Sequence, residues 1–337
     1  MRTILSFAIA AGLCAATGAQ AAAPEYHVTK TVSLGAPDSW DYLTYDAASH
    51  RVIVSHGSEA TVVDGVSGAV VGHLGPIKHA NGVMVANGRV YATSQDPNML
   101  VVFDLATLKK VASIPMGKGP DGALYDPASK KGFVVNEDDK TVTAIDVETN
   151  KPVFTTDLGG MPEFLAAAGG KVYVNIKDHR EVVRIDIASG KLDAHWPIPE
   201  CEAPHGMAVD AETHRLFSSC VNGKMSVVDT DKGTVVAMLP IGKRTDGAGF
   251  DPKRKLAFSS NSEGTLSVVA EKSADEFVAL GDVPTAPGAR AMAIDPDSGR
   301  IFVVTAEIAS SEPAPDGGKP TRFKFVPGTF KLLFIDP

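Results

Sequence analysis

The chain has 337 residues, of which 44% are hydrophobic, and it is rich in Gly (32) and Pro (22), a composition that suits short strands separated by turns. Asp and Glu number 40 against 32 Lys and Arg, so the formal net charge is −8. A net acidic protein lacks the positive charge that nucleic-acid phosphates attract, and we expect no nucleic-acid partner. The basic clusters Lys243-Arg244 and 253–255 flank turns and are interpreted as solvated rims.

Residues 1–21 have the pattern of a secretory signal peptide: a basic start at Arg2, an apolar run from Ile4 to Leu13 and a small-residue cleavage site at Ala19-Gln20-Ala21. The apolar run is too short to span a bilayer, and Leu13 is a poor lipobox residue before Cys14. We therefore predict Sec export to the periplasm, and a soluble mature protein with no membrane span.

The rest of the chain, 22–337, is a repeat. One copy runs from Pro120 to Asp146: an opening turn, a short apolar run, an Asp-Pro turn at Asp126, a β-rich run and a third run that ends on Asp. The closing Asp recurs about every 42 residues, a period typical of β-propeller blades. The closing residues are Asp64, Asp104, Asp146, Asp186 and Asp229.

Seven copies fit between the ends of the mature chain, and no segment shows a sustained helical period. Tyr26 to Leu34 is a strand without a preceding partner, and 330–335 is a third strand without a fourth after it. Each end supplies what the other lacks. We predict an all-β, seven-bladed propeller with four-stranded blades, forming a single domain, in which the N-terminal strand completes the last blade.

The second run of the repeat reads Lys171-Val-Tyr-Val-Asn175 and, less closely, Arg89-Val-Tyr-Ala-Thr93 and Gly132-Phe-Val-Val-Asn136. These runs resemble the signature of YVTN-repeat propellers, and the mature chain resembles the YncE family of periplasmic seven-bladed propellers. The resemblance implies fold and location, and the family includes binding proteins and proteins of unknown function. The chain departs from it at Ala270-Glu271, where Asp is expected, and at an insertion in the seventh blade.

That insertion, 306–327, is rich in Pro and Gly and is expected to be a long loop between the second and third strands of the last blade. Loops in that position share a face with the opening turns of the blades. Two interpretations stay open: a lid that folds over the channel mouth through Phe323 and Phe325, or a variable surface loop.

The residue at the opening of each blade should reach the rim of the central channel. We call these positions the ring residues, and in blade order they are Asp41, Asn81, Asp121, Glu163, His205, Asp246 and Arg290. Trp40 and His79 lie beside them, and His56 ends a strand that reaches the same face. We predict a ligand site formed by the ring residues and His79. The alternative is that the acids are turn formers and that Arg290 pairs with Asp246 and Asp41.

Oxygen ligands from Asn81, Asp121 and Glu163 would suit a divalent cation, Ca²⁺ or Mg²⁺. Histidines at 56, 79 and 205 would suit a softer ion. No ligand spacing is diagnostic, because residues from different blades are about 40 positions apart by construction. The cofactor therefore stays unidentified.

Cys201 lies in the turn that opens the fifth blade and Cys220 ends the second strand of that blade. In an oxidising compartment these two residues are expected to form a disulfide. The alternative is a metal site with His205.

The leading functional hypothesis is a monomeric binding or accessory protein that holds an unidentified small molecule, metal or protein partner at the channel mouth. The alternative is a metal-assisted hydrolase or lyase similar to propeller lactonases. There Glu163 helps to hold a cation, His205 or His79 acts as general base, and Arg290 stabilises developing negative charge. No nucleophile elbow, HExxH, CxxC or haem-attachment motif occurs, so the sequence does not decide whether the protein is an enzyme.

Overall fold

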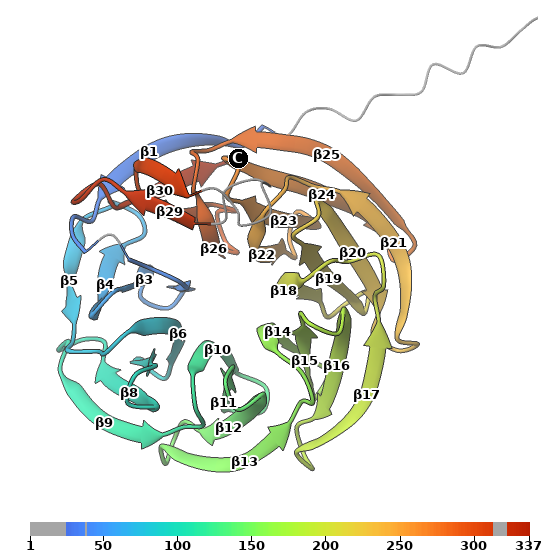
Figure 1. The fold of residues 1–337 in the computed structure, drawn as a ribbon, viewed down its shortest axis with the longest axis horizontal. Helices are drawn as coiled ribbons and strands as arrows, with labels where there is room; N and C mark the ends of the chain where they lie inside the picture. The colour runs from blue at the N-terminus through green and yellow to red at the C-terminus, as the bar shows by residue number, and fades with distance from the viewer. Residues whose placement is uncertain (1–24, 38, 313–321) are drawn as a thin grey trace, which may run out of the picture.

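The computed structural model describes residues 25–37, 39–312 and 322–337. Seven four-stranded antiparallel sheets are arranged as blades around a central axis (Figure 1), which confirms the predicted seven-bladed propeller. The signal peptide expected at 1–21 lies outside the described residues. In the described part of the chain, no helix is long and apolar enough to cross a membrane.

The blades follow chain order, and each runs from the central axis outward. Blade one consists of β2 (Leu43–Asp46), β3 (Arg51–His56), β4 (Glu59–Asp64) and β5 (Val70–Leu74). Blade two consists of β6 (Ala80–Ala86), β7 (Arg89–Ser94), β8 (Met99–Asp104) and β9 (Lys110–Pro115). Blade three consists of β10 (Pro120–Asp126), β11 (Lys131–Asn136), β12 (Thr141–Asp146) and β13 (Lys151–Asp157). Blade four consists of β14 (Pro162–Ala168), β15 (Lys171–Ile176), β16 (Glu181–Asp186) and β17 (Lys191–Pro197).

The remaining blades keep this order until the last. Blade five consists of β18 (Pro204–Asp210), β19 (Arg215–Cys220), β20 (Lys224–Asp229) and β21 (Thr234–Pro240). Blade six consists of β22 (Thr245–Asp251), β23 (Leu256–Asn261), β24 (Thr265–Ser273) and β25 (Glu276–Pro284). Blade seven is built from β26 (Arg290–Ile294), β27 (Ile301–Thr305), β30 (Lys331–Asp336) and β1 (His27–Ser33).

The N-terminal strand closes the ring as predicted. β1 pairs antiparallel with β30, from His27 opposite Asp336 to Ser33 opposite Lys331. In Figure 1 the blue N-terminal strand lies along the red C-terminal strand. The ends of the chain therefore share one sheet, and blade seven does not present β30 as an open edge.

The segment between β27 and β30 contains more structure than the expected loop. β28 (Ile308–Glu312) and β29 (Arg322–Phe325) pair as a two-stranded antiparallel sheet, with Ile308 opposite Phe325. We call this pair the hairpin. It places Phe325 on Trp40, with ring centroids 4.6 Å apart, and Trp40 also stacks on Phe330 at 4.7 Å.

The closing Asp residues have a structural role that explains why they recur. Asp64 Oδ1 accepts hydrogen bonds from the backbone N–H groups of Val66 and Ser67, and Asp146 Oδ1 does the same for Glu148 and Thr149. These bonds hold the pKa of both carboxyl groups below the ordinary value. Asp104, Asp186 and Asp229 hold the same turn in their blades.

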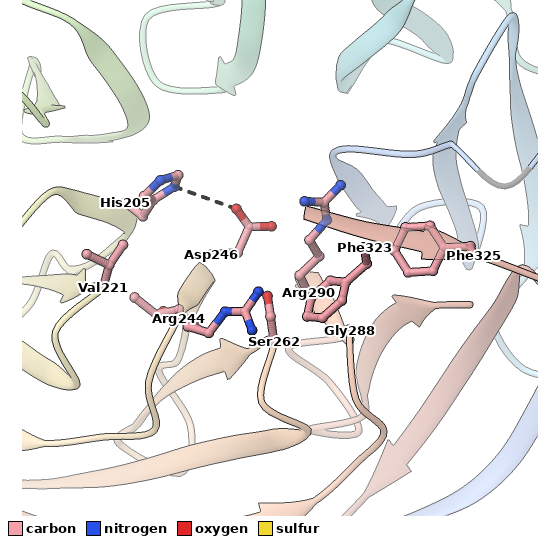
Figure 2. A pocket seen from close by; sticks show the side chains of 10 residues that line it. His205, Val221, Arg244, Asp246, Ser262, Gly288, Arg290, Phe323 and Phe325 are labelled. Atoms are coloured by element: carbon pink, nitrogen blue, oxygen red, sulfur yellow. Dashed lines mark ion pairs between the residues drawn. The ribbon is translucent and has the colours of Figure 1, made fainter. Parts of the chain in front are cut away.

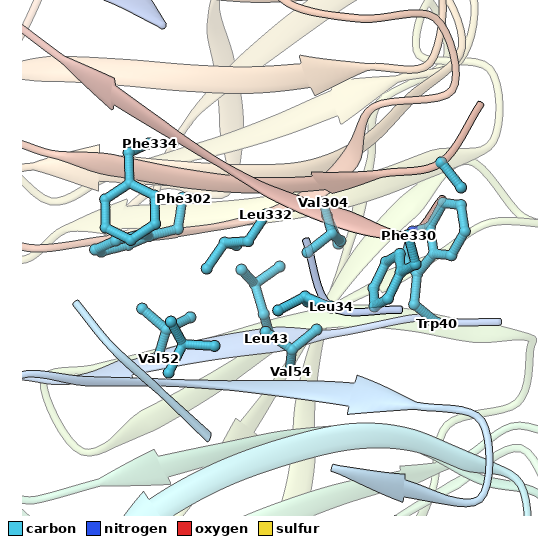
Figure 3. Close-up of a cluster of buried hydrophobic side chains, with 13 residues drawn as sticks. Leu34, Trp40, Leu43, Val52, Val54, Phe302, Val304, Phe330, Leu332 and Phe334 are labelled. Atoms are coloured by element: carbon cyan, nitrogen blue, oxygen red, sulfur yellow. The ribbon is translucent and has the colours of Figure 1, made fainter. Parts of the chain in front are cut away.

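The core lies between blades, where apolar side chains from neighbouring sheets interdigitate. In the contact between blades seven and one, Val52 and Leu43 pack with Phe302, Leu332 and Phe334 (Figure 3). Alternating strand residues supply this layer from both faces of each sheet, so every blade depends on its neighbours.

Gly82 and Gly206 each directly follow a ring residue, at points where the inner strands of two neighbouring blades approach closely. A Cβ on Gly82 would lie 2.1 Å from the carbonyl oxygen of Asp121, and one on Gly206 would lie 2.4 Å from the backbone nitrogen of Ala248. Only glycine permits these approaches. The backbones of neighbouring blades are thus held together beside the ring residues.

Candidate functional site

The ring residues converge on one cavity of about 290 Å³, which we call the ring cavity. The structure places every ligand-binding residue predicted from the sequence on its wall: Asp41, His79, Asn81, Asp121, Glu163, His205, Asp246 and Arg290. His56 does not belong to this wall, because it is fully buried and its imidazole contacts Pro37 O at 2.5 Å and Thr61 Oγ1 at 2.8 Å. Trp40 is also buried beside the site.

An aromatic pair adjoins the ring cavity. Tyr42 comes from blade one and Phe164 from blade four, and their ring centroids are 4.6 Å apart. The Tyr42 hydroxyl donates to Oδ2 of Asp121 at 3.3 Å. Burial raises the pKa of Tyr42 well above its ordinary value, so the phenol stays a hydrogen-bond donor at neutral pH.

Besides Tyr42, sequence reasoning missed three residues of the ring cavity, Gln95, Glu137 and Lys177. Each directly follows the second strand of its blade. The end of the second strand lies on the same face of the propeller as the opening turn of the blade. The alignment of blades that located the ring residues therefore applies to this position as well. Aligning the second strands of the blades in the same way identifies Gln95, Glu137 and Lys177 from the sequence.

Lys177 supplies positive charge to this acidic wall. Its Nζ donates to Oε1 of Glu137 at 3.0 Å and also binds Oε1 of Glu163. Burial acts to lower the pKa of Lys177, but attraction by Glu163 and Glu137 outweighs it and raises the pKa. Lys177 therefore remains charged.

Two other acids have raised pKa values. Burial, reinforced by repulsion from Asp246, raises the pKa of Asp41 to about 7. Burial and the nearby charges of Asp41 and Glu163 likewise raise the pKa of Asp121 well above the ordinary value. These two carboxyl groups are therefore partly protonated near neutral pH. A cationic group that enters the ring cavity can displace these protons.

His205 lies between acids from two blades. Its Nδ1 is 3.4 Å from Oε2 of Glu163 and 3.6 Å from Oδ1 of Asp246, yet this buried nitrogen is aligned for a hydrogen bond with neither. Asn81 is only 5% exposed, and its side-chain amide forms no hydrogen bond to the described residues. The Asn81 amide lines the ring cavity and can contact a ligand there, whereas Nδ1 of His205 is buried and faces the two carboxylates.

Arg290 does not form the ion pair with Asp246 and Asp41 that the sequence allowed. Its Nη2 contacts the carbonyl oxygen of Trp40 at 3.4 Å, and its guanidinium carbon lies 5.4 Å from the Trp40 ring centroid. Nε is buried without an acceptor among the described residues. The indole face thus positions the guanidinium.

A second pocket of about 620 Å³, the hairpin pocket, adjoins the ring cavity and shares His205, Asp246 and Arg290 with it (Figure 2). Its wall also includes Arg244, which lies with its guanidinium carbon 4.5 Å from the ring centroid of Phe323 on β29. Arg244 is half-buried, with Phe323 of the hairpin over one face of its guanidinium. Lys243 beside it is exposed.

Cys201 and Cys220 form the predicted disulfide, with an S–S distance of 2.01 Å and Cα atoms 5.1 Å apart. Both sulfurs are thereby removed from any metal site with His205. Across the described ranges, no group of three or more His, Cys, Asp or Glu side chains is placed to hold a metal ion.

The fold and the ring cavity define a seven-bladed β-propeller with a polar cavity beside its central axis. The family model described as "Outer membrane protein assembly factor BamB" matches residues 108–306, more than half of the chain, and the chain belongs to this family. A search of curated protein sequences finds no match.

Solved structures show the same fold at low sequence identity. The chain is similar to one from Kuenenia stuttgartiensis hydrazine synthase (TM-score 0.70, 17% identity, covering 79% of this chain and 92% of that one). It is also similar to a chain of the mitotic checkpoint complex (TM-score 0.74, 14% identity, 100% and 99% covered). A third is U3-55K (TM-score 0.74, 10% identity, 93% and 99% covered). At these identities the likeness concerns the fold alone.

Proposed function

We propose that this protein is an exported, periplasmic binding or accessory propeller whose ligand occupies the ring cavity and extends into the hairpin pocket. The family match to an outer membrane assembly factor, the resemblance to the YncE family and the disulfide support this location. On this proposal, 1–21 is the export signal and 22–337 is the mature, monomeric domain.

The observation that carries the proposal is the convergence of seven polar or charged residues, one from each blade, on a single cavity. The closing Asp residues recur because they hold the same turn in blades one to five. The ring residues differ from blade to blade, as the contacts of a specific asymmetric ligand require. Among them, Asn81 is only 5% exposed, and Nδ1 of His205 is buried without a hydrogen bond to the described residues.

The proposal is tested by a thermal-shift screen of the mature protein against amines, carboxylic acids, sugars, and Ca²⁺ and Mg²⁺ salts. We expect at least one compound to raise the melting temperature, and Glu163→Gln or His205→Ala to abolish that rise. Glu148→Gln is the matched control, since Glu148 is exposed and pairs only with Lys130 at 3.3 Å. The absence of any shift, or a shift that survives both ring substitutions, contradicts the proposal.

A second candidate, a hydrolase or lyase, rests on the position of His205. An imidazole held near two carboxylates has the arrangement of a general base, and Arg290 lines the same cavity to stabilise negative charge. The divalent cation placed on Asn81, Asp121 and Glu163 belongs to this candidate. Its test is hydrolysis of an ester and lactone panel with Ca²⁺ or Mg²⁺, compared with His205→Ala. No turnover in that panel contradicts it.

A further inference from the structure

The hairpin pocket differs in charge from the ring cavity. The titratable residues on its wall are Arg244, Arg290, His205 and Asp246, so positive charge outweighs negative charge even with a neutral imidazole. The ring cavity instead has five acidic side chains, at Asp41, Asp121, Glu137, Glu163 and Asp246, against the two cations Lys177 and Arg290, so its acids outnumber its cations. Two neighbouring spaces of opposite charge select ligand groups of opposite charge.

Both arginines present guanidinium groups without a carboxylate partner. Among the described residues, neither Arg244 nor Arg290 takes part in an ion pair. Each instead lies over an aromatic ring, Arg244 over Phe323 at 4.5 Å and Arg290 over Trp40 at 5.4 Å. A ring under the guanidinium face leaves the N–H edges of Arg244 available, and these edges match the two oxygens of a carboxylate or phosphate. Arg290 offers fewer donors, because its Nη2 contacts Trp40 O and its Nε is buried.

The backbone at Arg244 is in the left-handed region, with φ of 60°. The equivalent positions, two residues before the ring residue, share this conformation in four other blades, at His79, Gly119, Ala203 and Gly288, with φ of 58°, 63°, 41° and 80°. Glycine adopts this conformation without strain, whereas arginine does not. The left-handed residue is a shared feature of this turn, and Arg244 is carried on the same turn geometry as its counterparts in the other blades.

The wall that holds Arg244 is fixed by consecutive backbone hydrogen bonds across three blades. Arg244 N donates to Val221 O at 3.2 Å, Ser262 N donates to Arg244 O at 2.9 Å, and Gly288 N donates to Ser262 O at 2.8 Å. The guanidinium is therefore carried on a rigid support. A ligand that binds it does not first have to order this backbone.

We propose that the hairpin pocket binds an organic anion whose acidic group, a carboxylate or phosphate monoester, lies between Arg244 and Arg290 and whose apolar body packs on Phe323, Phe325 and Val221. This inference rests on the proposed function and names the ligand class of that site. The volume of about 620 Å³ accommodates a small organic molecule. Burial of the guanidinium groups against aromatic rings strengthens their attraction for an anion relative to open water.

The test measures binding of simple probes to the mature protein by isothermal titration calorimetry. The probes are 4-phenylbutyrate and phenyl phosphate as anions, with 4-phenylbutylamine and 4-phenylbutanol as the cationic and neutral counterparts. We expect at least one anion to bind and the amine and the alcohol to bind about 10-fold more weakly or not at all. The preference between the two anions distinguishes a carboxylate ligand from a phosphate ligand.

Arg244→Gln should weaken binding of the preferred anion about 10- to 100-fold, and Arg244→Lys should weaken it less, because lysine keeps the charge but loses the planar fork. Lys243→Gln removes the same charge from the neighbouring exposed residue and should change affinity less than about 2-fold. Circular dichroism and the melting temperature establish that each variant is folded.

Tighter binding of the amine than of both anions, no binding of either anion at millimolar concentration, or an anion affinity that Arg244→Gln leaves unchanged would overturn the inference. A compound from the thermal-shift screen that requires Glu163 but is indifferent to Arg244→Gln contradicts this inference and leaves the proposed function standing. Failure of both experiments contradicts both.

Discussion

Nδ1 of His205 lies 3.4 Å from Oε2 of Glu163, and this contact links blade five to blade four. Oε1 of the same carboxylate binds Lys177, so one buried side chain joins a permanent cation to a titratable imidazole. Asp246 of blade six approaches His205 from the other side at 3.6 Å. Charge changes at any one of these groups therefore act on the whole wall of the ring cavity.

Removing the cation of this network should destabilise the fold. Lys177→Gln leaves Glu163 and Glu137 without their partner in a part-buried site, and we expect a loss of about 1–3 kcal/mol in the free energy of unfolding. Lys140→Gln, which removes an exposed lysine 3.8 Å from Asp178, should cost less than about 1 kcal/mol. Urea denaturation at pH 7 measures both, and equal losses would contradict the role of Lys177.

Asp41 should make stability depend on pH. Its pKa of about 7 in the folded protein exceeds the ordinary value of 3.8, so between these values the folded state binds more protons than the unfolded state. The stabilising contribution is complete below pH 4 and is lost as pH rises through 7. Asp41→Asn keeps the neutral form, and it should gain stability relative to the wild type between pH 5 and pH 8, by up to about 4 kcal/mol.

The measurement for Asp41 is the difference in unfolding free energy between variant and wild type at pH 5, 6.5 and 8. Asp138→Asn is the control, since it makes the same substitution at an exposed aspartate. A difference for Asp41→Asn that does not change with pH would show that the carboxyl group is ionised throughout this range.

Breaking the disulfide should destabilise the protein by about 3 kcal/mol, because the bond closes a loop between residues 19 positions apart. Cys201→Ala with Cys220→Ala removes it without leaving buried thiols. Intact mass under non-reducing conditions checks the bond in the wild type, and urea denaturation measures the loss. Two alkylated cysteines in the untreated protein would show that the bond is absent.

The closure of blade seven should depend on Tyr26 as well as on strand pairing. Tyr26 is 7% exposed and packs edge-on against Phe258 of blade six, with ring centroids 5.1 Å apart. Tyr26→Ala should cost about 3 kcal/mol by analogy with other buried aromatic truncations. Val28→Ala, two residues further on at an exposed position, should change stability by about 0.5 kcal/mol or less. Similar effects of the two substitutions in thermal unfolding would contradict this account.

The fold and the ring residues were predictable from the sequence for one physical reason. The turn-holding Asp residues of blades one to five mark a common register, and in a propeller residues at the same register position lie at the same distance from the central axis. Asp41 and His205 could therefore be assigned to one wall, although they are far apart in the chain. The glycines that follow several ring residues agree with this register.

The hairpin pocket was not predictable in the same way. Its wall depends on the pairing of β28 with β29, which belongs to no repeat, so the blade register does not locate it. Arg244 was grouped with Lys243 because the two are adjacent, whereas the left-handed backbone and the contact with Phe323 separate their environments. The absence of an ion pair at Arg290 likewise follows from its stacking on Trp40, a contact between blades seven and one.

Because β1 pairs with β30, the last blade can be completed only after the rest of the domain has been synthesised. The first strand of the domain to be synthesised has no partner in its sheet until the last strand has been made. Blades one to six can form as the chain grows, but the ring cannot close before the C-terminus is available. Any chain that stops short of β30 therefore leaves β1 unpaired and exposes the edge of β27, and such exposed strand edges promote aggregation.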